Sequence, residues 1–171
     1  MRRILMNNRK KLLKLALCAV IAALYAAITI LTAPLSFGLV QFRLSEALMV
    51  FCAVEPVLGV GITLGCFLAN LFSTVTALDA VVGTLATALA CLWTSKCRKL
   101  WMLPVPTVLL NAVLVGGMLA FVLFPGNAAM GFCIAAAQVG FGELVVMVVL
   151  GLPLYQFVKK SNVMQRLFEN R

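Results

Sequence analysis

The residues of this sequence that could do chemistry are a few polar and charged side chains set inside long apolar runs. They are Arg43, Glu46, Asn70, Asp79, Gln138 and Glu143. Burying such groups in apolar surroundings is costly unless they find partners, so they normally face a shared interior or a cavity. We therefore expect these six residues to carry the function of the protein.

Two of these assignments have a structural alternative. Arg43 and Glu46 are three positions apart, which puts them on one helical face and within reach of each other. They can form an ion pair that only fixes a helix. Asp79 can cap a helix that starts near Ala80. The sequence leaves both alternatives open.

Other residue types limit the possible chemistry. The sequence has no histidine, which excludes His-based triads and HExxH zinc sites. It has no nucleophile with an adjacent base, so we expect neither an enzyme nor a metal site. It has no G-x-x-x-x-G-K motif and no cofactor motif, so any ATP must be used by partner subunits. The six cysteines show no C-x-x-C spacing and are expected to be apolar filler.

Composition places the chain in a membrane. Of its 171 residues 64% are hydrophobic and only 11% are charged, against about 25% charged in soluble domains. The length allows about six crossings and no separate soluble domain, so residues 1–171 are expected to form a single transmembrane domain. The net charge of +9 comes from residues that flank apolar runs, so we expect no nucleic-acid binding.

The basic residues predict the orientation. All but Arg43 fall into three clusters, at residues 2–14, 96–99 and 159–171. Lys and Arg collect on the cytoplasmic side of membrane proteins. We therefore predict a basic cytoplasmic tail at 1–14, a second cytoplasmic tail at 159–171, and an even number of crossings between clusters.

The apolar runs predict an all-α integral membrane protein with six transmembrane helices and both termini in the cytoplasm. The helices are expected at residues 15–33, 41–54, 57–73, 78–94, 104–124 and 129–158, the first stopping before Pro34. The second, of about 14 residues, would span only about 21 Å of a hydrocarbon core of about 30 Å. We expect it to be tilted or continued by non-helical chain, and to line a cavity together with residues 34–40.

Small residues mark surfaces where helices approach closely. Gly59, Gly61 and Gly65 are better explained by such packing than as a phosphate-binding loop. The first helix carries an overlapping small-x-x-x-small ridge of Ala19, Ala22, Ala23, Ala26 and Ala27. This ridge is either an internal packing seam or the docking surface for a partner helix.

Three stretches of the sequence resemble a known family. They are Phe37-Gly38-x-x-Gln41-Phe42-Arg43-x-Ser45-Glu46-Ala47, Gly65-Cys66-x-x-Ala69-Asn70-Leu71 and Asp79-x-x-x-Gly83-Thr84-Leu85-Ala86-Thr87. On these residues the chain resembles the QueT-type substrate-binding (S) components of energy-coupling-factor (ECF) transporters, which take up queuosine precursors. After about Leu100 the likeness is one of hydropathy only.

The resemblance implies a multi-pass subunit with an S-component-like bundle in the plasma membrane of a bacterium. Such a subunit captures a small metabolite outside and associates with a transmembrane scaffold subunit (EcfT) and two ATPase subunits. The implied ligand is a 7-deazaguanine: 7-aminomethyl-7-deazaguanine (preQ1), its nitrile precursor (preQ0) or queuine. A carboxylate can accept the two adjacent N–H donors of a guanine-like base, and Arg, Asn or Gln can bind its O6 atom. As substrate-binding residues for such a ligand, we expect carboxylates from Glu46, Asp79 and Glu143, and further donors or acceptors from Arg43, Asn70 and Gln138.

A different class of function is also compatible with the residues. A proton-coupled carrier or exporter of small cations would use Glu46 or Glu143 as its titrating site. Such a carrier would need no ATPase partner, and its transport would depend on the proton gradient.

Overall fold

The protein is an all-helical bundle. The computed structural model describes residues 2–38, 40–73 and 76–161, and the side chains of these from residue 11 onward. No strand occurs within these ranges. The helices in chain order are α1 (Arg2–Leu31), α2 (Ala33–Ser36), η1 (Leu44–Val50), α3 (Phe51–Val54), α4 (Leu58–Asn70), α5 (Asp79–Thr94), η2 (Leu100–Met102), α6 (Pro104–Leu110), η3 (Asn111–Val115), α7 (Gly116–Leu123), α8 (Ala128–Val146), η4 (Met147–Gly151) and α9 (Leu152–Lys160).

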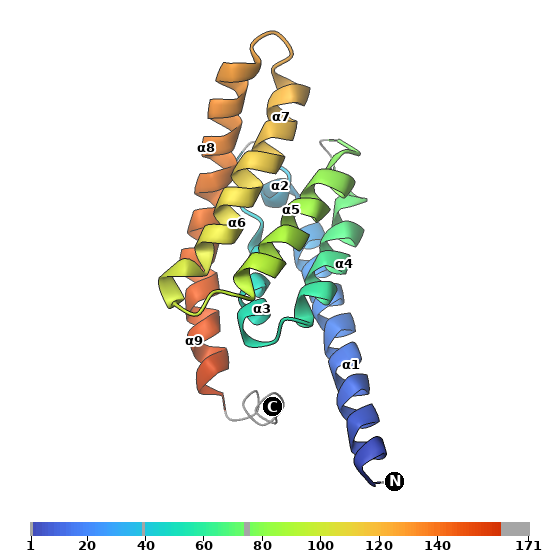
Figure 1. Cartoon of the computed structure of the whole chain (residues 1–171). Helices are drawn as coiled ribbons and strands as arrows, with labels where there is room; N and C mark the ends of the chain where they lie inside the picture. Colours follow the sequence, from blue (N-terminus) through green and yellow to red (C-terminus); the bar gives the residue numbers. More distant parts are fainter. Residues whose placement is uncertain (1, 39, 74–75, 162–171) are drawn as a thin grey trace.

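The predicted helices lie close to observed ones. The segment α6–η3–α7 forms one continuous rod over 104–123, and α8–η4–α9 forms another over 128–160 (Figure 1). Both rods contain a short π-helical stretch, η3 and η4. The main difference at the N-terminus is that α1 begins at Arg2, so the basic segment continues the first helix instead of preceding it. The predicted C-terminal tail lies outside the described residues from position 162 onward.

The region around Pro34 differs most from prediction. The first helix ends at Leu31, and Pro34 sits in the first turn of α2, where a proline removes no helical hydrogen bond. The predicted helix 41–54 is instead an extended stretch through Arg43, followed by the 3-10 helix η1 and a single α-helical turn, α3. The expectation of non-helical chain at this point is confirmed.

Glycines allow the elements to pack closely. Gly61 and Gly65 of α4 lie directly against α1, where a Cβ atom at position 65 would be 2.6 Å from the Ala22 carbonyl oxygen. A Cβ atom at Gly116 would be 2.7 Å from the Ala136 Cα atom, which brings the two long rods together. Gly59 packs on the side chain of Cys91. The prediction that the α4 glycines serve helix packing is therefore confirmed.

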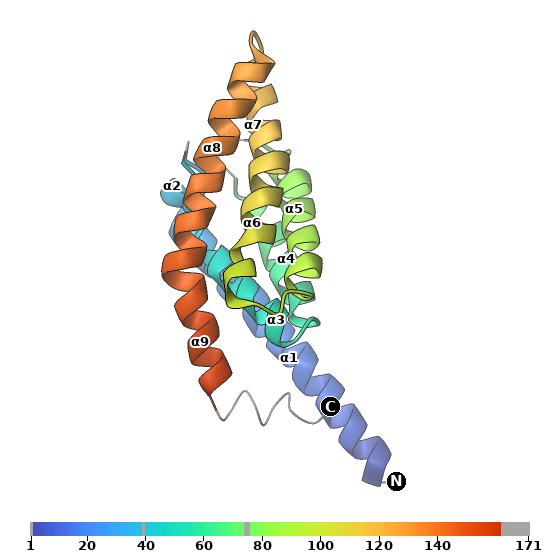
Figure 2. The ribbon, with the colours of Figure 1, turned by 60° about the vertical axis from the view of Figure 1, so that its left-hand side comes forward.

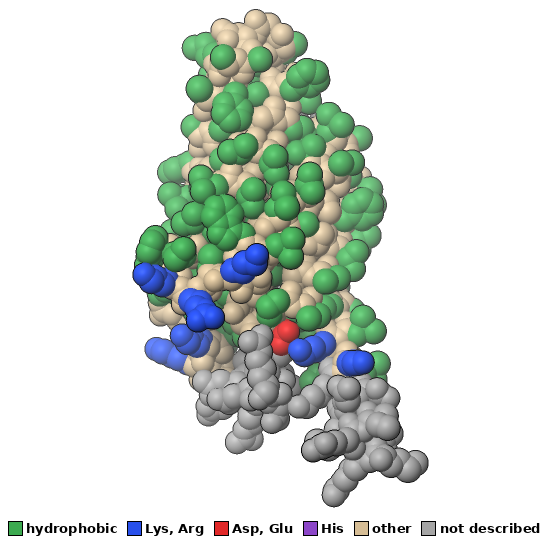
Figure 3. Space-filling model, in the orientation of Figure 1, with side chains coloured by type: hydrophobic (Ala, Val, Ile, Leu, Met, Phe, Trp, Pro, Cys, Tyr) green, Lys and Arg blue, Asp and Glu red, His purple; other side chains and the backbone are tan. Residues whose placement is uncertain are grey.

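The outer surface is apolar along most of its length (Figure 3). Three stretches are long and apolar enough to cross a membrane, at Lys11–Leu31, Leu100–Leu123 and Ala128–Lys160. The helices Leu44–Val54, Leu58–Asn70 and Asp79–Thr94 are apolar but shorter. Their 11 to 16 residues correspond to about 16 to 24 Å. The chain is thus a helical membrane protein, and its described residues form three long and three short apolar helices.

Charge gathers at one end of the bundle. Figure 3 shows Lys and Arg side chains in a band near the end where α1 begins and α9 finishes. Figures 1 and 2 show that α1 starts and α9 finishes at this same end. Here Lys14 of α1 forms an ion pair with Glu55, with 3.1 Å between Nζ and Oε2. Glu55 follows α3, so this ion pair joins the chain between α3 and α4 to the first helix.

The first prediction tests how the bundle is oriented. In a variant without native cysteines, Gly126→Cys and Leu35→Cys should react with a membrane-impermeant thiol reagent from one side of the membrane. Lys96→Cys and Lys160→Cys should react only from the other side. Leu35 is exposed and a Cβ atom at Gly126 would have nothing within 4 Å, whereas Ser36 is buried and a poor labelling site. Labelling of positions 96 and 126 from the same side would contradict the predicted orientation.

Candidate functional site

Arg43 lies in the centre of the bundle at the end of the non-helical stretch. It is 1% exposed, and its guanidinium carbon lies 5.7 Å from the centre of the Phe37 ring. Gly142 of α8 packs directly on the backbone of Gln41, so this glycine lets the stretch pass close to α8. In the part of the chain that the structure describes, none of the three guanidinium nitrogens has a hydrogen-bond partner.

Glu46 is held by residues from three elements. It belongs to η1, and its Oε1 atom accepts a short hydrogen bond from the Tyr25 hydroxyl of α1. The same atom accepts a hydrogen bond from Thr87 of α5 at 3.2 Å. The neighbouring Ser45 is bonded to Thr29 of α1 at 2.6 Å. The second carboxylate oxygen, Oε2, is buried and has no partner among the described residues.

Arg43 and Glu46 are close to each other but do not bond directly. They interact electrostatically, yet the guanidinium nitrogens stay without a partner in the described chain. The structural ion pair that the sequence left open is therefore not formed. Both groups therefore keep unused hydrogen-bonding capacity within the described part of the chain.

Asn70 and Asp79 meet at the corner between α4 and α5. The Asn70 side chain donates to the Asp79 main-chain oxygen at 3.0 Å and to Cys66 Sγ at 3.2 Å. The Asp79 carboxylate accepts a hydrogen bond from Ser73. It does not act as the helix cap that the sequence left open as an alternative, because α5 begins at Asp79 itself and no side chain caps it. Asp79 instead ties the corner together and orients Asn70.

Gly83 is the point where Asn70 and Arg43 approach each other. A Cβ atom at position 83 would lie 2.7 Å from Asn70 Nδ2 and 3.6 Å from Arg43 Nη1. The Asn70 Oδ1 atom is buried and unpaired in the described structure. The α4–α5 corner and the central non-helical stretch therefore contribute to one polar site.

Glu143 reaches the same site from α8. It is 1% exposed, and neither carboxylate oxygen has a hydrogen-bond partner among the residues described. It interacts electrostatically with Arg43 and Glu46. Gln138, also predicted for the site, is only half-buried and lies one helical turn before Gly142. Four of the six predicted residues, Arg43, Glu46, Asn70 and Glu143, are thus brought into one enclosed cluster.

The structure shows further buried polar residues that the sequence analysis did not assign to the site. Gln41 and Asn111 are both 1% exposed, and the Gln41 side-chain nitrogen and both polar atoms of Asn111 have no partner in the described chain. Tyr25 and Thr87 are added because they hold Glu46. Asn111 was detectable in principle, as a lone amide in the apolar run 104–124. Nothing in the sequence links Tyr25 or Thr87 to Glu46.

Part of the alanine ridge of α1 packs inside the bundle, and the other part is exposed on its surface. Ala22 is buried against Gly65 of α4, so this part of the ridge is an internal seam. Ala26 is half-buried. Ala19, Ala23 and Ala27 are exposed, four positions apart on one face of the helix. These three form the exposed alanine ridge, and they leave a smooth surface open to a neighbour.

An apolar helical bundle that encloses unpaired charged and amide groups defines a membrane protein with a polar interior site. The sequence model of the QueT transporter family matches residues 15–160, which is most of the chain. The protein therefore belongs to the QueT transporter family. No curated protein and no solved structure matches the chain significantly.

The second prediction concerns the close contact between α8 and the non-helical stretch. Gly142→Ala should lower the melting temperature of the purified protein by several degrees, because a methyl group would collide with the Gln41 backbone, and overpacking costs about 1–3 kcal/mol. Gly117→Ala is the matched control, since a Cβ atom there would meet nothing closer than 3.7 Å. Equal melting temperatures for both variants would contradict the contact.

Proposed function

We propose that this protein is the substrate-binding (S) component of an ECF-type importer, and that it captures a 7-deazaguanine precursor of queuosine from outside the cell. The observation that carries the proposal is the enclosed set of Arg43, Glu46 and Glu143, whose polar atoms have few or no partners in the described chain. Membership of the QueT transporter family supports it. Buried groups of this kind are costly unless they find hydrogen-bond partners, and a bound ligand can supply them.

The free polar atoms suit the edges of a guanine-like base. Glu143 has both oxygens free, so it can accept the two adjacent N–H donors of the base as a bidentate pair. Arg43 and the amides of Gln41 and Asn70 can then bind the remaining acceptors and donors. Phe37, which stacks on Arg43, helps to close this part of the site. Asp79 and Gln138 are also proposed to contribute to substrate binding, from the edge of the site.

Charge balance favours the cationic candidates among the three ligands. Arg43 contributes one positive charge, and Glu46 and Glu143 contribute two negative charges, so the three groups sum to a net charge of about minus one when ionised. A monocation would neutralise this sum. Of the three 7-deazaguanines, the nitrile is neutral, whereas preQ1 and queuine each carry an aminomethyl nitrogen that is cationic at neutral pH. We propose that this nitrogen binds the Oε2 atom of Glu46, which has no partner in the described chain, and that a cationic ligand such as preQ1 is preferred to the nitrile.

The proposed delivery uses partners. The sequence has no Walker motif, so we propose that a scaffold subunit (EcfT) and two ATPase subunits supply the energy. The exposed alanine ridge is the proposed docking surface for a helix of the scaffold, because small side chains allow close approach in a membrane. We further propose six crossings of a bacterial plasma membrane with both termini in the cytoplasm. The basic end of the bundle in Figure 3 supports that orientation.

The second candidate function is a proton-coupled carrier. It is favoured by one observation, that Glu143 is buried in the membrane region with both oxygens unpaired in the described structure. Such a carrier would transport by itself. Imposing a pH gradient on vesicles that contain only this chain distinguishes the two functions, because an S component alone should give no gradient-driven uptake.

The third prediction separates the two carboxylates. Glu143→Gln should weaken binding of both preQ1 and the neutral nitrile by about tenfold to a hundredfold, the equivalent of a lost charge-assisted hydrogen bond. Glu46→Gln should weaken binding of preQ1 by a similar factor and leave the nitrile nearly unchanged. Isothermal titration of the purified variants measures both. Equal losses for both ligands in both variants would contradict the assignment of the aminomethyl group to Glu46.

The fourth prediction concerns the docking surface. Ala23→Trp should reduce ligand uptake and co-purification of the ATPase subunits together, because a bulky side chain holds the partner helix away. Ligand binding by the isolated subunit should be retained. Leu24→Trp is the matched control, exposed on α1 but turned about 100° around the helix from Ala23. Uptake that survives Ala23→Trp would place the docking surface elsewhere.

A further inference from the structure

An open groove runs along the seam between α1 and α4 on the outside of the bundle. Its volume is about 430 Å³. Its walls are apolar, with Leu15 of α1 on one side and Val60 and Leu64 of α4 on the other. The two polar side chains that line it, Lys11 and Lys14, come from the first turns of its α1 wall. The groove is therefore apolar along most of its length and basic at one end.

We propose that this groove binds one phospholipid with an anionic headgroup, from the leaflet that meets the basic end of the bundle. The phosphate lies beside Lys11, and one acyl chain follows the groove between α1 and α4. The proposal requires that the chain is embedded in a membrane, but it does not depend on the ligand proposed for the buried site.

The dimensions of the groove fit one leaflet. From Lys11 to Ala22, its α1 wall spans about 16 to 17 Å at about 1.5 Å per residue. Half of a hydrocarbon core of about 30 Å is about 15 Å. An acyl chain in this groove would therefore reach from the headgroup level to about the middle of the bilayer. The lysines lie where the phosphate of the same lipid would be.

The charges at the basic end favour an anionic headgroup over a zwitterionic one. Lys14 is already paired with Glu55, so this pair is neutral as a unit. Lys11 is exposed, and no acidic partner lies within ion-pair distance of it among the described residues. One unneutralised cation thus remains at the end of the groove. Basic pockets of this kind on the cytoplasmic side of membrane proteins bind anionic headgroups.

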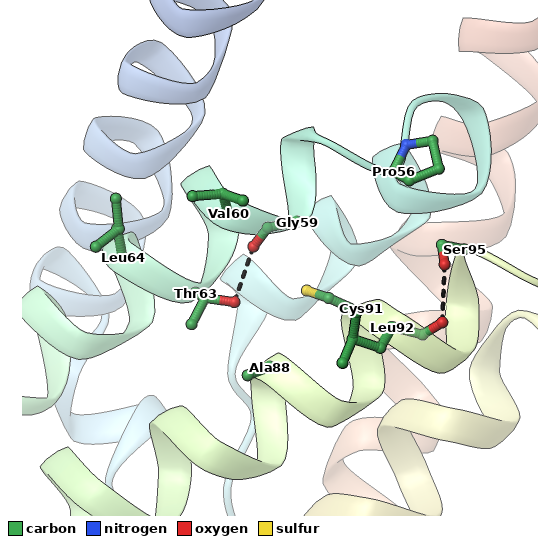
Figure 4. A pocket seen from close by; sticks show the side chains of 9 residues that line it. All are labelled: Pro56, Gly59, Val60, Thr63, Leu64, Ala88, Cys91, Leu92 and Ser95. Atoms are coloured by element: carbon green, nitrogen blue, oxygen red, sulfur yellow. Dashed lines mark hydrogen bonds between the residues drawn. The ribbon is translucent and has the colours of Figure 1, made fainter.

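A second groove on the same bundle lacks this feature. It lies between α4 and α5, has a volume of about 320 Å³ and is lined by no charged side chain (Figure 4). Its two hydroxyl groups are used internally, since Thr63 donates to the Gly59 carbonyl and Ser95 to the Leu92 carbonyl, each at 2.8 Å. It can hold an apolar chain but offers nothing to select a headgroup. It therefore serves as an internal control.

The alternative occupant is a helix of a partner protein. Ala19 of the exposed alanine ridge also lines the α1–α4 groove. A partner side chain could fill the apolar part of the groove. An apolar partner helix would not neutralise the charge of Lys11, which has no ion-pair partner among the described residues. The basic end is the observation that favours a lipid.

The test measures lipid retention by the full chain. The purified protein is titrated with phosphatidylglycerol or phosphatidylcholine of the same acyl chains, and bound lipid is counted by native mass spectrometry. We expect one phosphatidylglycerol to be retained preferentially. Lys11→Gln should weaken its retention about fivefold, the effect expected for one lysine near a membrane surface, and Lys160→Gln at the same end should change nothing.

A second pair of variants tests the groove itself. Val57→Phe fills the α1–α4 groove, and Leu92→Phe fills the α4–α5 groove; both positions are exposed. Only Val57→Phe should abolish the selective retention. Equal retention of the two lipids, or no effect of Lys11→Gln, would overturn the proposal. So would a Val57→Phe variant that keeps its lipid but no longer co-purifies with partner subunits, because the groove would then be a protein docking site.

Discussion

The structure depends on one constraint: an arginine and two glutamates are held in the middle of a bundle whose outside faces lipid. Arg43, Glu46 and Glu143 are each at most 1% exposed. Isolated charges in such surroundings cost far more than a typical protein's net stability of about 5–15 kcal/mol. The electrostatic attraction between Arg43 and the two glutamates offsets part of this cost. The hydrogen bonds from Tyr25 and Thr87 to Glu46 offset another part. The other polar atoms of the arginine and the two glutamates have no partner among the described residues, which is the basis of the proposed ligand site.

This constraint explains why the chain is not helical where a helix was expected. In the observed structure the backbone of Gln41 lies against Gly142 of α8, and Arg43 Nη1 lies beside Gly83 of α5. In place of a regular helix, the Phe42 amide donates to the Leu35 carbonyl at 2.9 Å, and the Glu46 amide to the Arg43 carbonyl at 2.9 Å. Non-helical backbone at membrane depth is tolerated where it is buried in protein. Gly83 and Gly142 provide the space for it.

The sequence predicts the helices that depend on hydropathy alone. It does not predict the local structure and the side-chain contacts that depend on tertiary packing. The two long rods follow directly from apolar runs bounded by Pro104, Asn127 and the basic clusters. The 3-10 form of η1 could not be predicted, because it is imposed by packing on α1, α5 and α8. Arg43 and Glu46 were identified by their charge alone. Their failure to pair with each other, and the bonds from Tyr25 and Thr87, depend on helices that are distant in sequence.

The register of α1 shows how one helix can serve the interior and the exterior together. Tyr25 and Ala22 point inward, one to Glu46 and the other to Gly65, while Ala19 and Ala23 point outward. A change of one position along the helix turns a side chain by about 100°, so alanines with the same spacing fall on different faces. A substitution at Ala22 would therefore disturb the seam with α4 that supports the polar site, whereas one at Ala23 would alter only what approaches from the membrane. The small-residue pattern alone cannot separate these roles, because it is set by the position of α4 against α1.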